Sequence, residues 1–228
     1  MKRMFSRISH RYDLLNGIMS GGRHHAWRRM ASRMAAEGLS GPTLDVASGT
    51  GDFTFELARL HGVSSAIGVD FTREMLMVAN RKSERRRLSE QVAFTLGEAH
   101  ALPFQDDQFI CATVGFGIRN FADVNRALQE MARVVRPGGR VVSLEIVRME
   151  GRGPISRLFP FHFKHTVPLL GAIIAGDRQA YTYLPESVQT FLSAREMGQA
   201  MEAAGLKSVR YLKLALGTVA IHVGEKPE

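Results

Sequence analysis

This chain has 228 residues, of which 45% are hydrophobic, and it carries a formal net charge of +8 and a single cysteine. The length suits one α/β domain whose core needs no disulfide, and one cysteine excludes a multi-cysteine zinc site, so we expect no metal. The first 22 residues lack the apolar stretch of a signal peptide, and the longest apolar run, 166–175, is about half of the ~20 residues that span a bilayer. We therefore expect a cytoplasmic protein.

The basic excess favours an anionic partner, which could be nucleic acid or the surface of an anionic membrane, or it serves only solubility. Much of the excess lies in residues 81–87 (RKSERRR), at the end of a helical pattern where the helix dipole favours cations. A solvated helix face is the commonest explanation of such a run. No aromatic residues interleave with it, as they would in a platform for single-stranded nucleic acid. We expect no nucleic-acid partner.

The predicted elements alternate along the first two thirds of the chain. Apolar residues recur at helical spacing before residue 40: Trp27, Met30, Ala31 and Met34, with Gly38 ending the pattern. Strand-like runs follow, with helical segments between them: 43–47, 65–70, 92–96, 109–115 and 140–147. The segment 123–136 carries one apolar helical stripe, and Pro137-Gly138-Gly139 ends it. This alternation predicts a mainly parallel sheet that is covered on both faces.

The last third of the chain differs in character. Residues 151–186 are rich in Phe, Pro, His and Tyr and show no clean period. Ser193 and Glu196 then form a predicted capping box for a short helix that Gly205 ends. Two closing strands, 208–214 and 218–223, are consistent with an antiparallel hairpin at the sheet edge.

The stretch 44–52 (LDVASGTGD) joins an apolar strand to a glycine-rich turn, which lets backbone N–H groups approach a ligand closely. Thr54 stands where the dinucleotide fingerprint needs its third glycine, and this weakens a nicotinamide or flavin interpretation. Asp70 ends the next apolar strand, where a ribose hydroxyl pair would lie. Turn and acid together look like the S-adenosylmethionine site of a Rossmann-like methyltransferase. The alternative is an ordinary turn in which Asp70 caps a helix.

Two further strand ends carry candidate site residues. After the third strand, Glu98 could accept a hydrogen bond from an adenine amino group, and Ala99 leaves room for the ring; the alternative is a polar loop. After the fourth strand, Arg119 and Asn120 lie beside the topological switch point, where open α/β sheets bind ligands. Arg119 could stabilise a phenolate, and Asn120 could bind a substrate oxygen or a water molecule. The alternative is that Asn120 or Asp123 caps the following helix.

Polar and aromatic residues gather in two other regions. One group precedes Trp27: Tyr12, Asp13, Asn16, His24 and His25. The other forms a candidate substrate wall within 151–186: Phe161, His162, Phe163, His165, Asp177, Tyr181 and Tyr183. The alternative for the first group is that each histidine is a satisfied surface or core residue. The alternative for the second group is that the aromatic residues are core and the histidines are solvated.

Segments spread over nearly the whole chain resemble the ubiquinone/menaquinone biosynthesis C-methyltransferase family. The glycine motif alone would indicate only a superfamily, whereas Phe-Gly-x-Arg-Asn and the tyrosine segments narrow the resemblance to this family. The segments are MF (4–5), RYDLLN (11–16), LDVASGTGD (44–52), ALPF (101–104), FGIRN (116–120), RPGGR (136–140), YLPES (183–187) and GTVAIH (217–222).

The resemblance implies a Rossmann-like S-adenosylmethionine-dependent methyltransferase, with 1–228 as one domain. It comprises a helical amino-terminal lid (1–40), a cofactor-binding core (43–147) and a substrate-side insertion (151–186). Thr50, Asp70, Glu98 and Ala99 fall on the family's cofactor contacts, although the family often has Asn or Asp in place of Glu98. The remaining expected cofactor residues lie around them: Asp45, Ala47, Gly49, Gly51, Phe71 and Gly115.

The implied reaction is methylation of a ring carbon of a prenylated quinol. Demethylmenaquinol is favoured over the benzoquinol precursor of ubiquinone or another small lipophilic acceptor. The expected catalytic residues are Arg119, Asn120 and Tyr12, and the base is left open between Tyr12, a histidine and a water molecule held by Asn120. The expected substrate residues are His24, Phe116, His165, Tyr181 and Tyr183.

Two other classes of protein fit this sequence less well. A nucleic-acid methyltransferase would explain the charge, but an Asn-Pro-Pro-Tyr motif is absent from the sequence. A non-catalytic cofactor-binding subunit would not need the aromatic residues of 151–186. That segment also combines apolar residues with Arg152, Arg157 and Lys164, which suits peripheral contact with the inner face of an anionic membrane. A homodimer is compatible with the sequence.

Overall fold

The computed structural model describes residue 17, residues 20–150 and residues 187–228. Its strands are β1 (Gly41–Val46), β2 (Val63–Asp70), β3 (Val92–Leu96), β4 (Phe109–Gly115), β5 (Val135–Ile146), β6 (Lys207–Leu214) and β7 (Val219–Glu225). Its α-helices are α3 (Arg23–Ala36), α4 (Asp52–Ala58), α5 (Arg73–Arg86), α6 (Val124–Val134) and α9 (Ala194–Ala203). Short 3-10 turns, η1 (Ile118–Asn120) and η2 (Ala215–Gly217), follow β4 and β6.

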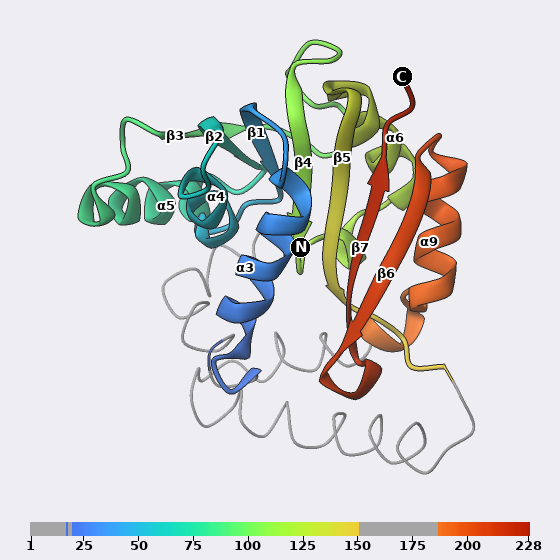
Figure 1. Ribbon diagram of the computed structural model, residues 1–228. Helices are drawn as coiled ribbons and strands as arrows, with labels where there is room; N and C mark the ends of the chain where they lie inside the picture. The colour runs from blue at the N-terminus through green and yellow to red at the C-terminus, as the bar shows by residue number, and fades with distance from the viewer. Residues whose placement is uncertain (1–16, 18–19, 151–186) are drawn as a thin grey trace.

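The strands form one seven-stranded sheet in the order β3-β2-β1-β4-β5-β7-β6 (Figure 1). Neighbouring strands from β3 to β5 are parallel, whereas β7 runs antiparallel to both β5 and β6. This topology confirms the predicted Rossmann-like α/β fold with an antiparallel carboxyl-terminal edge. The chain moves outward from β1 to β3 and then returns to the other side of β1 with β4. The topological switch point, where such sheets bind ligands, therefore lies between β1 and β4.

The expected bounds of β3 and β4 are confirmed, but the expected start of β5 at Arg140 is wrong. Helix α6 ends at Val134, and β5 begins at the next residue. Pairing between β4 and β5 shifts register after Phe109, so Pro137-Gly138-Gly139 lie within an irregular stretch of the strand. The strand fits there because Gly139 lacks a Cβ, which would lie 2.6 Å from the carbonyl oxygen of Ile110. The proline and glycines therefore mark an irregularity within β5 and not the end of the helix, which lies at Val134.

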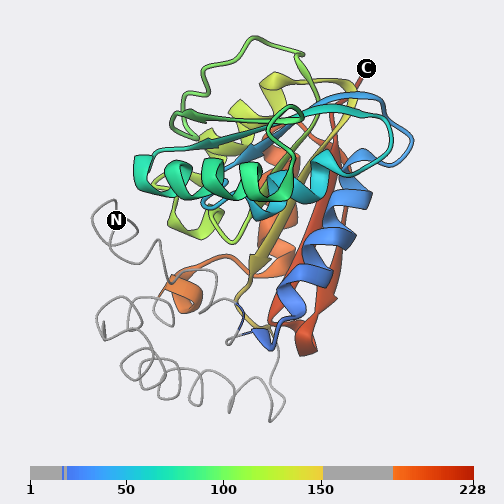
Figure 2. The same cartoon turned by 90° about the vertical axis from the view of Figure 1, so that its left-hand side faces the viewer.

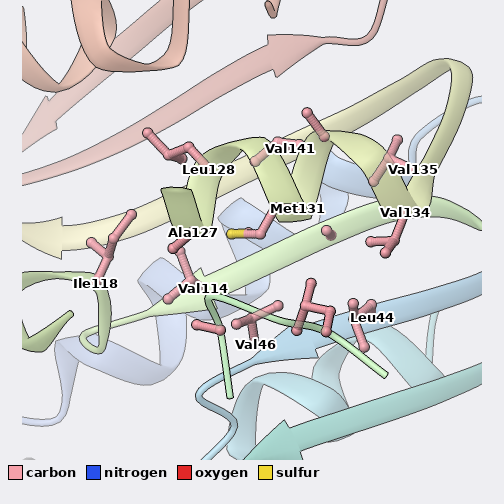
Figure 3. Close-up of a cluster of buried hydrophobic side chains, with 14 of the residues drawn as sticks. Leu44, Val46, Val114, Ile118, Ala127, Leu128, Met131, Val134, Val135 and Val141 are labelled. Carbon is pink, nitrogen blue, oxygen red and sulfur yellow. The ribbon is translucent and has the colours of Figure 1, made fainter. Parts of the chain in front are cut away.

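Helices α6 and α9 cover one face of the sheet. The apolar stripe of α6 is fully buried and packs on the central strands (Figure 3), which confirms the periodicity seen in the sequence. The stripe and its partners include Ala127, Leu128, Met131, Val134, Leu44, Val46, Val114 and Val141. Met197 and Met201 of α9 extend this cluster, and the predicted capping box of Ser193 and Glu196 begins the helix.

The opposite face is covered by α3 and α4, and α3 lies across the sheet from α6 and α9 (Figures 1 and 2). Ala31 and Ala35 of α3 are fully buried in a cluster that reaches Val142 and Leu144 of β5. One side of α3, which lies within the expected amino-terminal lid, therefore belongs to the hydrophobic core. The rest of that region lies mostly outside the described residues.

The basic run at the end of α5 is only partly a solvated face. Lys82 Nζ lies 2.7 Å from Asp52 Oδ1 at the start of α4, and an Arg86 guanidinium nitrogen lies 3.2 Å from the same oxygen. The Arg86 guanidinium also lies over the Phe55 ring, 4.6 Å from its centroid. The interpretation as a solvated face is therefore wrong for Lys82, which is half-buried, whereas Arg86 is exposed although it also contacts α4. Arg81, on the same run, is exposed.

Within the described ranges, none of the helices combines the length and the apolar character needed to cross a membrane.

Candidate functional site

A cavity of about 310 Å³ opens at the carboxyl ends of the parallel strands. Residues that directly follow four neighbouring strands line it, because parallel strands end at one edge of the sheet. They are Ala47 and Gly49 after β1, Asp70, Phe71, Thr72 and Met75 at and after β2, Glu98, Ala99 and His100 after β3, and Gly115, Phe116, Gly117, Asn120, Phe121 and Ala122 at and after β4. The cavity thus lies at the predicted switch point.

Asp70 joins the glycine-rich turn to the end of β2. Its Oδ2 accepts the backbone N–H of Gly49 at 2.9 Å, and its Oδ1 accepts the backbone N–H of Thr72 at 2.8 Å. Burial raises the pKa of the Asp70 carboxyl, and these N–H groups oppose that rise. Each carboxylate oxygen has a second lone pair, so the group can still accept hydrogen bonds from a ligand in the cavity.

Two glycines of the turn have different surroundings. A Cβ added to Gly49 would meet no protein atom within 4 Å, so this glycine faces open space. A Cβ added to Gly51 would lie 2.7 Å from the Phe94 ring, so this glycine faces the core. Gly49 therefore leaves room for a ligand, whereas Gly51 leaves room for helix α4 to pack on β3.

The ends of β1 and β4 meet closely beneath the cavity. Ala47 and Phe116 both have left-handed backbone angles, with φ of 54° and 58°, which are unfavourable for residues with a Cβ. Gly117 allows the approach, because a Cβ there would lie 2.8 Å from the Cβ of Ala47. Strained backbone held by packing is a frequent property of binding sites.

Asp45 lies beneath the turn and is 1% exposed. Its Oδ2 accepts a hydrogen bond from the Thr54 hydroxyl at 2.8 Å, and its Oδ1 accepts one from the Thr113 hydroxyl at 3.1 Å. Burial raises the pKa of this carboxyl to about 7. Thr54, which departs from the dinucleotide fingerprint, therefore anchors α4 to β1 through Asp45.

Arg119 and Glu145 form a buried ion pair behind the wall of the cavity. One guanidinium nitrogen of Arg119, Nη1, donates to Glu145 Oε1 and to the Phe116 carbonyl oxygen, both at 2.7 Å. Glu145 is 0% exposed, and it also accepts the backbone N–H groups of Arg119 and Ile146. The pair fixes the turn that carries Phe116 and Asn120 against β5.

Comparison with known proteins decides the family. The sequence matches the ubiE/COQ5 methyltransferase family over residues 1–226. The chain belongs to this family. The demethylmenaquinone methyltransferase of Thermus thermophilus is 44% identical over 224 residues, which cover 98% of this chain and 100% of that protein. The protein of the same name from Deinococcus radiodurans is 41% identical, over 99% of this chain and 92% of its own length.

The fold agrees with that membership. A solved S-adenosylmethionine-dependent methyltransferase from Thermotoga maritima superposes with a TM-score of 0.68 at 20% identity, covering 99% of each chain. This likeness concerns the fold alone. Together with the family match, it identifies the chain as a methyltransferase of the Rossmann-like class.

The structure brings most of the expected cofactor residues together. Those that line the cavity are Ala47, Gly49, Asp70, Phe71, Glu98, Ala99 and Gly115. Asp45 and Thr50 line a second, smaller cavity under the same turn, and Gly51 lines neither. The roles of all ten as cofactor contacts stay predictions.

The expected catalytic and substrate residues are more scattered. Asn120 and Phe116 line the cavity, whereas Arg119 and His24 are not among its lining residues. His24 is 3% exposed, and its Nδ1 lies 2.6 Å from the Ser20 hydroxyl oxygen. Four further candidates lie outside the described residues: Tyr12, His165, Tyr181 and Tyr183.

Sequence reasoning missed several residues of the ubiE/COQ5 site. Thr72 and His100 line the cavity because they lie in the turns after β2 and β3, and that position was a usable signal; Met75 lines it from the first turn of α5. Glu145 could have been found as a single acid within the apolar strand 141–147. In the described part of the chain, no group of His, Cys, Asp and Glu could hold a metal ion.

Proposed function

We propose that this ubiE/COQ5 family member methylates a ring carbon of a prenylated quinol, with demethylmenaquinol as acceptor and menaquinol as product. The observation that carries the proposal is the cavity at the switch point, where Asp70 and the open side of Gly49 lie together. The names of the relatives support the acceptor. The benzoquinol precursor of ubiquinone and other lipophilic acceptors are the alternatives that the test below separates.

S-adenosylmethionine fits the residues that line the cavity, and when bound it supplies an electrophilic methyl group. Asp70 would accept hydrogen bonds from the ribose hydroxyls, because it ends β2 and faces the cavity. Ala99 and Met75 offer apolar walls for the adenine ring, and Glu98 can accept from its amino group. Gly49 leaves the space that the cofactor needs beside the turn.

Alignment of the acceptor is the main task of the chain in this reaction. A quinol that loses a hydroxyl proton becomes a phenolate whose ortho carbon is nucleophilic. The residues after β4, among them Phe116 and Asn120, form the side of the cavity where this ring would be held. Holding the carbon in line with the methyl group supplies much of the rate.

Proton removal needs a base near the ring. The Asn120 amide is not basic, but it can hold a water molecule that takes the proton. His100 also lines the cavity, yet its Nε2 lies 3.2 Å from the backbone N–H of Asp123 and accepts from it, so this lone pair is occupied. We therefore propose a water molecule on Asn120, or Tyr12, as the base.

Arg119 contributes through the turn that it fixes. Its guanidinium binds the Phe116 carbonyl and Glu145, so it orients Phe116 and Asn120 toward the cavity. Stabilisation of the phenolate by its positive charge stays a prediction. A preorganised charge of this kind contributes more in a site that excludes water than it would in bulk solvent.

Access to a prenylated acceptor points to a membrane surface. A prenyl tail partitions into a bilayer, and each buried methylene contributes about 0.8 kcal/mol to that partition. We propose that Arg152, Arg157 and Lys164, which lie outside the described residues, contact anionic headgroups while the ring enters the cavity.

The test is an assay of methyl transfer from labelled S-adenosylmethionine to short-chain quinols. Demethylmenaquinol and the benzoquinol precursor are offered separately and then in competition. We expect turnover with demethylmenaquinol at least tenfold above that with the benzoquinol, roughly the discrimination that one changed ring contact gives. Transfer only to the benzoquinol would contradict the proposed acceptor, and transfer to neither would contradict the proposed function.

A further inference from the structure

Arg28 is a buried cation of α3 that has no part in the function proposed so far. It is 6% exposed, and its guanidinium lies over the Phe116 ring at 5.4 Å from the centroid. Its Nη1 is buried and has no hydrogen-bond partner among the residues that the structure describes. An unpartnered buried guanidinium nitrogen is costly, so a native protein that retains one needs an explanation for it.

Two carboxyls, those of Asp45 and Asp52, are influenced by the charge of Arg28, but both are hydrogen-bonded or ion-paired to other side chains. Asp45 accepts from Thr54 and Thr113, and Asp52 pairs with Lys82 and Arg86. The Arg28 charge opposes the rise that burial causes in the pKa of Asp45 and helps to lower the pKa of Asp52, yet Arg28 forms a direct ion pair with neither among the described contacts. Its charge therefore offsets these acids, while its Nη1 stays available for a further hydrogen bond.

Arg28 lines the second, smaller cavity of about 20 Å³, together with the glycine-rich turn. Ala47, Gly49 and Gly115 line both cavities, so the small one adjoins the large one beneath the turn. A space of this size accommodates a small polar group. A molecule that extends from Asp70 past Gly49 would reach Arg28 at its far end.

We propose that Arg28 binds the α-carboxylate at the amino-acid end of S-adenosylmethionine. This inference rests on the proposed function, because it takes S-adenosylmethionine as the occupant of the large cavity. A guanidinium binds a carboxylate in a planar, bidentate manner, which fits a group that enters from the turn. The bound carboxylate would satisfy the buried Nη1 and would fix the methionine end of the cofactor against α3.

The experiment is calorimetric titration with two ligands that differ only in this group: S-adenosylhomocysteine and its decarboxylated analogue. The wild-type protein should bind S-adenosylhomocysteine about ten- to a hundredfold more tightly, the contribution of charged hydrogen bonds. Arg28→Met should remove that preference and leave the affinity for the decarboxylated analogue unchanged. Arg28→Lys should retain part of it, because the charge remains while the bidentate geometry is lost.

Two control variants separate this role from general damage. Arg29→Met changes the exposed neighbour on α3 and should keep the full preference for the carboxylate. Asp70→Asn should weaken both ligands by the same factor, because it acts at the ribose. The melting temperature of ligand-free Arg28→Met checks that the variant folds, and we expect it to be moderately lower than that of the wild type, because Arg28 offsets the charges of Asp45 and Asp52 and lies over the Phe116 ring.

The inference is overturned if wild-type protein binds both ligands equally, or if Arg28→Met weakens both alike. The wild-type comparison decides the matter even if a variant fails to fold. An absence of binding of either ligand to the wild type would instead overturn the proposed function, and the two failures are thus distinguishable.

Discussion

The two glycines Gly49 and Gly51 lie in the same turn but have different roles. Both have positive φ, 54° and 85°, so alanine at either position carries a backbone cost of about 1–2 kcal/mol. They differ in what a Cβ would meet: open space at Gly49 and the Phe94 ring at Gly51. One is expected to serve ligand binding and the other the packing of the fold.

Gly49→Ala should lower the affinity for S-adenosylhomocysteine at least tenfold, because the methyl group enters the space that the ligand needs. Its unfolding free energy should fall by only about 1–2 kcal/mol, the backbone cost. Gly51→Ala should lose a further ~1–3 kcal/mol through overpacking against Phe94. Urea denaturation and calorimetry of both variants measure these quantities.

The matched control is Gly51→Ala combined with Phe94→Leu, which makes room for the added methyl group. This double variant should regain part of the stability that Gly51→Ala loses. If Gly49→Ala binds the ligand as the wild type does, Gly49 does not face the cofactor, and its place in the site is wrong.

At the scale of elements, the pair of Arg119 and Glu145 joins the turn after β4 to β5. Arg119→Met would leave the fully buried Glu145 carboxylate without its cation. We expect a loss of about 3–5 kcal/mol in unfolding free energy, the typical cost of breaking a buried pair. Arg119→Met with Glu145→Met should recover most of that loss, because both charges are removed.

The double variant also tests the role of Arg119 in turnover. The Phe116 carbonyl would still lack its donor, so we expect methyl transfer to stay at least tenfold below the wild-type rate in single-turnover measurements. A double variant that is both stable and fully active would assign Arg119 to stability alone.

A second contact between elements is made by His222 of β7, which is fully buried. Its Nε2 lies 2.8 Å from the Ala194 carbonyl oxygen at the start of α9 and donates to it in the neutral ring. Burial lowers the pKa of this imidazole below its ordinary value of 6.5. As pH falls below about 6.5, the unfolded chain takes up a proton at His222 while the folded protein does not, so stability is lost.

We therefore expect the difference in unfolding free energy between wild type and His222→Asn to shrink between pH 7 and pH 5. The raised pKa of Asp45 changes stability with pH in the opposite direction, because the folded protein holds that proton more tightly. Both proteins contain Asp45, so its contribution cancels in the difference. Denaturation curves at several pH values measure this quantity. A difference that is independent of pH would mean that His222 titrates normally.

At the scale of the whole molecule, the sequence predicted the half of the site that follows the strands. The apolar runs defined β3 and β4, and residues directly after parallel strands share one edge of the sheet. Asp70, Glu98, Ala99 and Asn120 could therefore be placed together without coordinates. The predicted capping box of Ser193 and Glu196 depends on local spacing and was also accessible.

The features that could not be predicted from the sequence depend on contacts between segments that lie far apart in the chain. In the sequence Arg28 is one of several cations on an amphipathic helix. Its place beside the glycine-rich turn appears only when α3 is packed on the sheet. From the sequence alone Lys82 belongs to a solvated basic run, and its pairing with Asp52 appears only when α5 lies beside α4. Hydrophobic periodicity shows which face of a helix is buried, but it does not show which buried polar group that face will meet.

The central claim is that this cavity transfers a methyl group to a quinol carbon. Its most direct test is nuclear magnetic resonance of the product formed from demethylmenaquinol and S-adenosylmethionine carrying a ¹³C-labelled methyl group. We predict that the label appears as a methyl group bonded to a ring carbon, with both quinol oxygens unmethylated. Label on a quinol oxygen, or unchanged quinol after prolonged incubation with folded protein, would contradict the account.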